Sequence, residues 1–408
     1  MVHKIKSLLK TSNLLLAEQA AISFFQFGLI FVLSKVLQPE VFSQYIVVNS
    51  VVILCFLAIQ TIITNPSLIL SQTKWVDSYS RYFNATLLTT VSLALIIGLP
   101  FLASNFTSLN VRLNALFCLI SISVYDAIRK RFLYEKKNIG LLFVVSSTSV
   151  TLILLMLFLY STLTISYVFF FQGLFFLFSS AVLMNKISII KHIKIFVSAR
   201  FYSKFLKEHY RFSRFLFLGV VFYWGYTSGL YIFLYGILAA DEITQLKSAQ
   251  NLSGIFSVLL VYIENRYSSD LSRKVELGEN TKNQVLMLIK KNAKQTIFIS
   301  IVSLLAMVFL YQKFYYDSYG SGLFLLIIFF AQQQALLYSK PFTVALKAHK
   351  KTAPFLIAHI FSSILAGVFT IIFVFNQTTA AAAFMFSSIL FAILIYYYWH
   401  HHEKNINH

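Results

Sequence analysis

Residues 110–160 decide the fold. They read NVRLNALFCLISISVYDAI over 110–128, RKRFLYEKKN over 129–138 and IGLLFVVSSTSVTLILLMLFLY over 139–160. Two apolar stretches flank a hairpin that holds five Lys and Arg residues. A helix needs roughly 20 mostly apolar residues to cross the hydrocarbon of a bilayer, and basic loops favour the cytoplasmic side. The segment therefore predicts two membrane-spanning helices that are joined on the cytoplasmic side.

Similar apolar stretches recur along the whole chain. Of its 408 residues, 58% are hydrophobic and only 12% are charged, which is more apolar surface than a water-soluble fold of this length can hide. The stretches are continuous instead of alternating, which excludes a transmembrane β-barrel. Twelve spans are predicted, at residues 14–37, 41–63, 82–103, 110–128, 139–160, 164–185, 212–236, 248–264, 295–311, 321–339, 354–375 and 378–399.

The basic residues predict the orientation. With the N-terminus in the cytoplasm, 30 of the 34 Lys and Arg residues fall in the inner gaps or at the inner ends of spans, and the outer gaps and outer ends hold only Lys35, Arg112, Lys247 and Lys313. An even number of spans then places both termini in the cytoplasm. The formal net charge of +20 would indicate a nucleic-acid partner for a soluble protein. Here it predicts contact with anionic bilayer lipids and no nucleic acid.

A long, basic inner gap divides the chain in two. Residues 186–211 form a basic linker between an N-terminal six-helix lobe (1–185) and a C-terminal six-helix lobe (212–408). RFLYEKKN (131–138) follows the fourth span, and VALKAHKKT (344–352) follows the tenth. Both end in Lys-Lys and a small polar residue, which indicates a parallel repeat. The alternative is that any cytoplasmic loop is rich in lysine.

This architecture resembles the multidrug/oligosaccharidyl-lipid/polysaccharide (MOP) exporter superfamily, and within it the polysaccharide transporter branch of Wzx-type O-antigen flippases. The resemblance covers essentially the whole chain, but it lies in the architecture and not in a sharp motif. It implies an all-α, polytopic membrane protein of MATE-like fold in a bacterial inner membrane. It also implies transfer of undecaprenyl-pyrophosphate-linked oligosaccharide, an O-antigen or capsule repeat unit, to the periplasmic leaflet by alternating access. The protein partners that it implies are a polysaccharide polymerase and a chain-length regulator.

A polar stripe on the first span supplies the main site candidates. An ionisable side chain in hydrocarbon costs at least about 2.5–3.5 kcal/mol on insertion scales, so it is a functional candidate by default. Glu18 is such a residue, and Gln19, Ser23 and Gln26 continue a polar face along the helix. One interpretation is a cavity wall that binds sugar hydroxyls, with Glu18 taking up a proton or cation for coupling. The other is that Glu18 reaches out to the interface.

The remaining candidates are scattered over both lobes. Arginine suits phosphate oxygens and aromatic rings suit sugar rings, although interfacial anchoring explains each residue equally well. Asp126 is predicted to pair locally with the basic residues that follow it, and Glu264 is given the same interpretation beside Arg266. The other candidates are Asn49 in the second span, Arg112 and Lys247 at outer starts of spans, Arg211 and Arg214 at the inner start of the seventh, Tyr223 and Trp224 within it, and Gln250 and Asn251 in the eighth.

Two other function classes compete with the flippase. A MATE-like exporter of small cationic drugs predicts an acidic cavity, and intramembrane carboxylates are few in this chain. A membrane enzyme of polysaccharide assembly predicts a large outer loop or a histidine in a polar membrane cavity. The predicted outer loops are short, and His359 is the one histidine well inside a predicted span. No catalytic residue, cofactor or metal site is predicted, since phosphate-loop and metal-ligand spacings are missing from the sequence.

Overall fold

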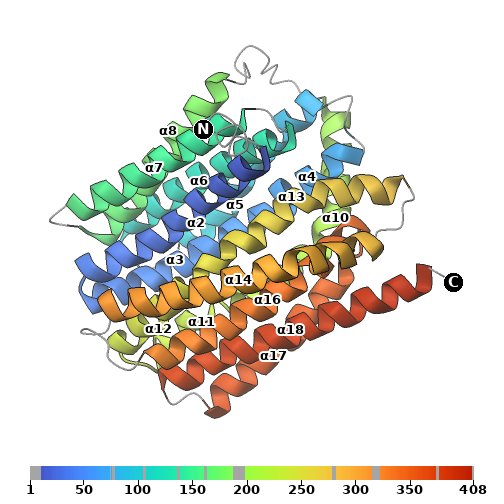
Figure 1. The fold of residues 1–408 in the computed structure, drawn as a ribbon. Coiled ribbons are helices and arrows are strands. Elements are labelled where there is room, and N and C mark those ends of the chain that lie inside the picture. Colours follow the sequence, from blue (N-terminus) through green and yellow to red (C-terminus); the bar gives the residue numbers. More distant parts are fainter. Residues whose placement is uncertain are drawn as a thin grey trace, which may run out of the picture. The chain divides into compact units, whose positions relative to one another are not determined.

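The computed structural model describes residues 11–73, 75, 79–103, 107–135, 138–159, 163–186, 198–277, 282–314, 322–373 and 376–406, which are nearly all helical (Figure 1). The helices of the first half are α2 (Thr11–Val36), α3 (Pro39–Ile59), α4 (Asn65–Thr73), α5 (Tyr79–Ala103), α6 (Leu109–Glu135), α7 (Ile139–Leu159) and α8 (Ile165–Lys186). Those of the second half are α10 (Ala199–Gly225), α11 (Leu230–Leu234), α12 (Ala240–Ser253), α13 (Ser257–Glu276), α14 (Lys282–Phe314), α16 (Leu323–Ala348), α17 (Ala353–Phe373) and α18 (Gln377–Ile406).

Ten helices in the described part of the chain are long and apolar enough to cross a membrane. They include Pro39–Leu70, which runs through α3 and α4, and Ala199–Leu234, which runs through α10 and α11. The eighth and ninth predicted spans are helical as well, but neither is a helix long and apolar enough to cross a membrane. A 3₁₀ turn at Gly254–Phe256 interrupts the eighth, and the apolar part of the ninth is the shorter helix Ser300–Lys313. The multi-pass helical fold is therefore confirmed, whereas the count of twelve spans stays a prediction.

The chain forms two compact units. The first unit comprises Met1–Leu37 and Val51–Phe217, and the second comprises Gln38–Ser50 and Leu218–His408. The chain therefore passes between the units inside α3 and inside α10. Residues 199–211, which the sequence assigned to the linker, form the first half of α10, and residues 187–197 lie outside the described part. The predicted lobe boundaries themselves stay predictions.

Corresponding helices of the two units repeat each other closely. α7 and α17 both have 21 residues, and each begins at the same distance along the chain from the start of the preceding helix, α6 or α16. In the first half α6 and α7 both pack on α8, and in the second half α16 and α17 both pack on α18. The two basic hairpins each hold one non-glycine residue in the left-handed region, Asn138 and Lys350. These features agree with a parallel repeat.

A proline explains how the first half of α10 is bound to the first unit. A π-helix at Gln60–Thr64 joins α3 to α4, and Pro66 follows it. Because Pro66 has no amide hydrogen, the Ile62 carbonyl four residues earlier loses its helical donor. His209 of α10 takes that place, with its Nδ1 lying 3.0 Å from the Ile62 oxygen. Nδ1 is therefore the protonated nitrogen, and Nε2 accepts the Tyr82 hydroxyl at 2.7 Å.

The close approach of α8 to α6 generates a test of the packing. A Cβ at Gly173 would lie 2.6 Å from the Phe117 ring and 3.2 Å from the Cα of Cys118. We expect Gly173→Ala to destabilise the protein by about 1–3 kcal/mol, since the core has no room for an added methyl group. Gly140→Ala on α7 is the control, because its Cβ would meet nothing within 4 Å. Equal thermal midpoints of the two purified variants would contradict this packing.

Candidate functional site

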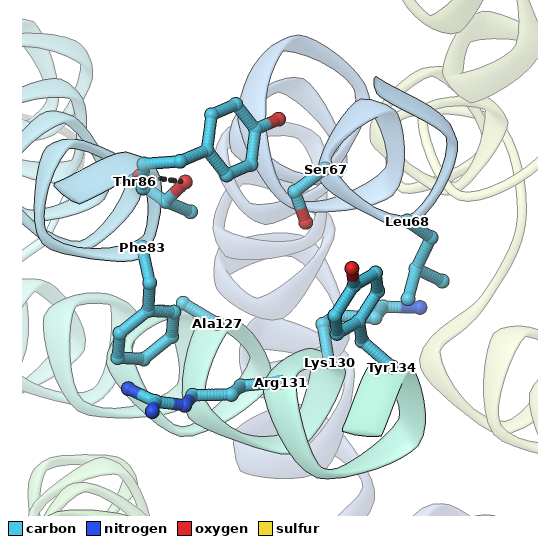
Figure 2. A pocket seen from close by; sticks show the side chains of 9 residues that line it. Ser67, Leu68, Phe83, Thr86, Ala127, Lys130, Arg131 and Tyr134 are labelled. Atoms are coloured by element: carbon cyan, nitrogen blue, oxygen red, sulfur yellow. Dashed lines mark hydrogen bonds between the residues drawn. The ribbon is translucent and has the colours of Figure 1, made fainter. Parts of the chain in front are cut away.

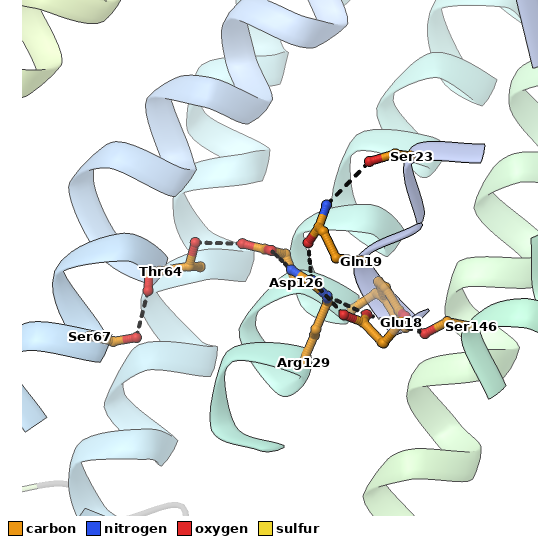
Figure 3. Close-up of polar contacts among 9 residues, drawn as sticks. Glu18, Gln19, Ser23, Thr64, Ser67, Asp126, Arg129 and Ser146 are labelled. Atoms are coloured by element: carbon orange, nitrogen blue, oxygen red, sulfur yellow. Dashed lines mark hydrogen bonds and ion pairs between the residues drawn. The ribbon is translucent and has the colours of Figure 1, made fainter. Parts of the chain in front are cut away.

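Glu18 lies at the centre of a buried polar network in the first unit (Figure 3). The side chain is fully buried, and Arg129 of α6, itself only 5% exposed, binds it through both carboxylate oxygens. The Arg129 Nε lies 2.6 Å from one oxygen and Nη2 lies 2.8 Å from the other. Such a two-pronged contact is the strongest that arginine makes with a carboxylate. The Glu18 charge is therefore compensated inside the unit and does not reach out to an interface.

The predicted polar stripe on α2 faces this arginine. Gln19 accepts a hydrogen bond from Arg129 Nη2 at 2.7 Å, and its own amide donates to the Ser23 hydroxyl at 3.3 Å. The structure thus brings three of the four stripe residues into one network. The fourth, Gln26, lies in α2, but its side chain is outside the described residues.

Asp126 extends the network to the second helix of the unit. Its Oδ1 lies 3.9 Å from Arg129 Nη1, one turn along α6, as the predicted local pairing requires. Its Oδ2 accepts the Thr64 hydroxyl at 2.6 Å. On the other side, Ser146 of α7 donates to Glu18 at 3.5 Å. Side chains from α2 and α6 therefore contact the Arg129 guanidinium directly, and Thr64 and Ser146 join the network through the two carboxylates.

The second unit holds a different cluster of charges. Glu264 of α13 accepts hydrogen bonds from Lys340 and Lys347, which lie two turns apart on α16. The Lys347 ammonium is 2.6 Å from Glu264, and all three side chains are about one-fifth exposed. Two cations meet one carboxylate here, so the cluster carries an excess positive charge. The Arg266 side chain, which the sequence suggested as the Glu264 partner, is outside the described residues.

The two clusters occupy corresponding places in the repeat. Thr64 and Asp126 join the second and fourth helices of the first unit. Glu264 and Lys340 join the eighth and tenth helices of the chain, which are the second and fourth helices of the other half. A hydroxyl meets a carboxylate in one unit, and a carboxylate meets an ammonium in the other. A side-chain contact between the second and fourth helices is thus present in both halves, but the charges of the residues that form it differ.

Further candidates lie in the second unit, on α10 and α12, and make separate contacts on both sides of the break between α10 and α11. Lys247 donates to the Gln250 side chain at 2.9 Å, and its ammonium lies 4.7 Å from the centre of the Tyr231 ring. Tyr223 contacts the His359 ring in a tilted arrangement, with ring centres 5.6 Å apart. Trp224 donates to the backbone carbonyl of Ser50 at 2.7 Å. Interrupted helices of this kind often line sites in transporters.

The other candidates are not brought together. Arg211 and Arg214 are exposed on α10, and the Arg214 guanidinium lies 4.7 Å from the centre of the Phe215 ring. Arg112 donates to the backbone carbonyl of Leu102 near the start of α6. Asn49 and Asn251 are half-buried in the second unit. Within the described residues, no group of three or more His, Cys, Asp or Glu side chains is arranged to hold a metal ion.

The buried pair generates a direct thermodynamic test. We expect Glu18→Gln or Arg129→Gln to destabilise the protein by about 3–5 kcal/mol, since the first leaves Arg129 without its two-pronged partner and the second leaves Glu18 and Asp126 without their cation. The double variant should recover part of that loss, because Asp126 is then the one carboxylate of the network that has lost its cation. The measurement is the denaturation midpoint of all three purified variants. Additive losses in the double variant would contradict the pairing.

The control for this cycle is an exposed ion pair. Lys350 and Glu276 lie 3.2 Å apart, and their side chains are 42% and 37% exposed. Glu276→Gln should cost at most about 1 kcal/mol, because water screens the pair.

Comparison with known proteins shows the fold. No protein-family profile and no curated protein sequence matches the chain. Among solved structures, it is similar to the eukaryotic MATE transporter AtDTX14, with a TM-score of 0.74 at 12% identity over 99% of this chain and 98% of that one. It is also similar to a MOP superfamily transporter from Pyrococcus furiosus, described as having a binding pocket of reversed polarity that suggests a different function (TM-score 0.68, 10% identity, 99% and 96% covered). A third is an outward-facing MATE family multidrug resistance transporter of the same superfamily (0.66, 11%, 98% and 96%).

Proposed function

We propose that this chain is a membrane transporter that moves an anionic, undecaprenyl-pyrophosphate-linked oligosaccharide from the inner to the outer leaflet of a bacterial plasma membrane. The fold supports the transport part of this proposal, because its structural neighbours are transporters and not enzymes. Alternating access is the mechanism proposed with it. A polysaccharide polymerase and a chain-length regulator are the proposed partners, and both termini are proposed to lie in the cytoplasm.

We propose an anionic cargo because the charges of the buried carboxylates are already neutralised by cations of the protein. Among the described residues, Glu18 and Asp126 are the buried carboxylates, and both contact Arg129. The half-buried Glu264 is held by two lysines. A small cationic drug needs a carboxylate whose charge is available. The excess charge of the Glu264 cluster is positive instead, which suits pyrophosphate and hinders a cation.

The membrane potential supplies a driving force for this direction. A negative interior favours outward movement of an anion by about 2.3 kcal/mol per charge per 100 mV. A dianionic pyrophosphate therefore gains roughly twice that amount if its charge is not cancelled in transit. Proton or cation antiport through Glu18 is the alternative drive, and it requires the contact with Arg129 to open during transport.

A MATE-like exporter of small molecules is the second candidate, because two of the neighbours are MATE transporters. Reconstituted vesicles distinguish the two. We expect the protein to move a fluorescent, pyrophosphate-linked lipid oligosaccharide across the bilayer and to leave a cationic dye where it is. Arg211→Gln combined with Arg214→Gln should slow lipid transfer by about tenfold, which corresponds to a lost charged hydrogen bond. Lys350→Gln, at an exposed cation elsewhere, should not. Dye movement without lipid transfer would select the exporter.

The coupling role of Glu18 has its own test. In a strain that lacks the gene, we expect Glu18→Gln to reduce surface polysaccharide. Glu18→Gln combined with Arg129→Gln is the matched variant, since it restores the charge balance without restoring a titratable group. If the double variant recovers surface polysaccharide, stability and not proton uptake explains the loss, and Glu18 is not the coupling residue.

A further inference from the structure

Two lysines of the second unit bring more positive charge to Glu264 than this carboxylate neutralises. Lys347 donates to its Oε1 at 2.6 Å, and Lys340 donates to its Oε2. An ammonium group carries three N–H donors, and among the described residues each of these two finds one acceptor side chain, the Glu264 carboxylate. Two donors on each lysine are therefore left for water or for a ligand.

The packing of α13 on α16 directs the three side chains to one place. Lys340, Val344 and Lys347 follow one another at the four- and three-residue spacing of a single helix face. Val344 belongs to an apolar cluster with Leu271 of α13, which lies two turns along that helix from Glu264. One cation would be enough to join the helices through this carboxylate. The second lysine adds repulsion between like charges, so helix packing alone does not explain it.

We infer that Lys340 and Lys347 form a binding site for the two phosphate groups of a diphosphate, and that Glu264 occupies this site as an internal competitor until the ligand displaces it. Each Glu264 oxygen holds one ammonium, as an oxygen from each phosphate would. Lysine binds phosphate as a point charge. Once Glu264 leaves, two positive charges face the two negative charges of the diphosphate. The identity of the ligand rests on the proposed function, whereas the competition with Glu264 does not.

A ligand can reach this site without opening the core. The side chains of Glu264, Lys340 and Lys347 are each about one-fifth exposed. Glu264 is the last residue of the eighth predicted span, and both lysines follow the tenth, so the cluster lies at the predicted inner boundary of the membrane. Lipid-linked phosphates lie at this depth. The Phe355 ring, whose centre is 5.8 Å from the Lys347 ammonium, keeps one side of that cation apolar, which strengthens its attraction to an anion.

The small hollow between α4, α5 and α6 provides a contrast (Figure 2). Lys130 and Arg131 line it, but most of its polar side chains already have partners in the protein. Ser67 and Thr86 donate to backbone carbonyls at 2.6 Å and 3.0 Å. Arg131 donates to Glu135 at 2.7 Å, and Lys130 has a partner as well. The two cations of this hollow do not share one carboxylate, so it carries no comparable anion site.

The test measures binding of inorganic pyrophosphate to the full-length protein in an uncharged detergent at fixed ionic strength. We expect Glu264→Gln to bind about tenfold more tightly than the wild type, since the competitor has lost its charge, and Lys347→Gln to bind about tenfold less tightly, as for a lost charged hydrogen bond. The two changes together should return the affinity toward the wild-type value. Glu264→Asp has a shorter side chain that reaches the lysines less well, so it should also gain affinity. It keeps the charge, which makes the test usable if the neutral variant does not fold.

Glu276→Gln is the matched control. Glu276 also lies on α13, but it pairs with one lysine, Lys350, in the hairpin that follows α16. We expect this variant to bind pyrophosphate as the wild type does. An unchanged or lower affinity in Glu264→Gln would overturn the inference, because an ion pair that only joins two helices contains no competitor to remove. An equal gain in Glu276→Gln would also overturn it, because net charge alone would then explain the effect.

Two further probes identify the source of the phosphate groups. Farnesyl diphosphate should bind more tightly than short-chain phosphatidylglycerol, with the same order of variants. Phosphatidylglycerol that binds equally well in that order would replace the diphosphate with a membrane lipid and overturn the assignment. None of these measurements involves transport. A negative result therefore leaves the transfer assay in vesicles unaffected, and dye movement in vesicles would leave the binding of pyrophosphate unaffected.

Discussion

The guanidinium of Arg129 is the group on which the first unit depends. It carries a full charge at 5% exposure, and such a charge is tolerated only when oxygen atoms surround it. Glu18 and Gln19 of α2 and Asp126 of α6 supply those oxygens. The requirement fixes how α2 lies against α6, and through Thr64 and Ser146 it extends to the second and fifth helices. Lipid offers no alternative partner, so a shift of any one helix exposes a charge to hydrocarbon.

The repeat shows that the backbone arrangement does not require these particular charges. The second half keeps the packing of its fourth and fifth helices on the sixth and a bridge between its second and fourth helices, but Lys340 stands where the first half has Asp126. Its partner Glu264 is shared with Lys347. Apolar packing therefore supports the shared fold, while polar residues make the units different.

The sequence predicted the spans well and the contacts between them poorly. Hydropathy placed the hairpin of α6 and α7 almost correctly, because lipid demands long apolar runs. It missed the continuation of α6 to Glu135 and of α18 to Ile406, since helices continue past the hydrocarbon, where hydropathy carries no signal. The polar stripe with Glu18 was visible through its period on one helix. Arg129, 111 residues away, was not, because nothing in a single sequence says which buried cation meets which carboxylate. Lys340 and Lys347 were not predicted as the partners of Glu264 for the same reason.

The π-helix at Gln60–Thr64 contacts both α10 and the buried charge network. Within five residues it offers the Ile62 carbonyl to His209 and the Thr64 hydroxyl to Asp126. Such single-turn insertions are frequent at functional sites, and Pro66 provides the physical cause of this one, since it removes the regular donor to Ile62. The first half of α10 is thus bound to the same short segment as the buried charges, while its last eight residues, 218–225, belong to the second unit. Residues 60–64 therefore hold two neighbours through hydrogen bonds: Asp126 of the charge network, and the part of α10 that lies in the first unit, before the chain continues into the second.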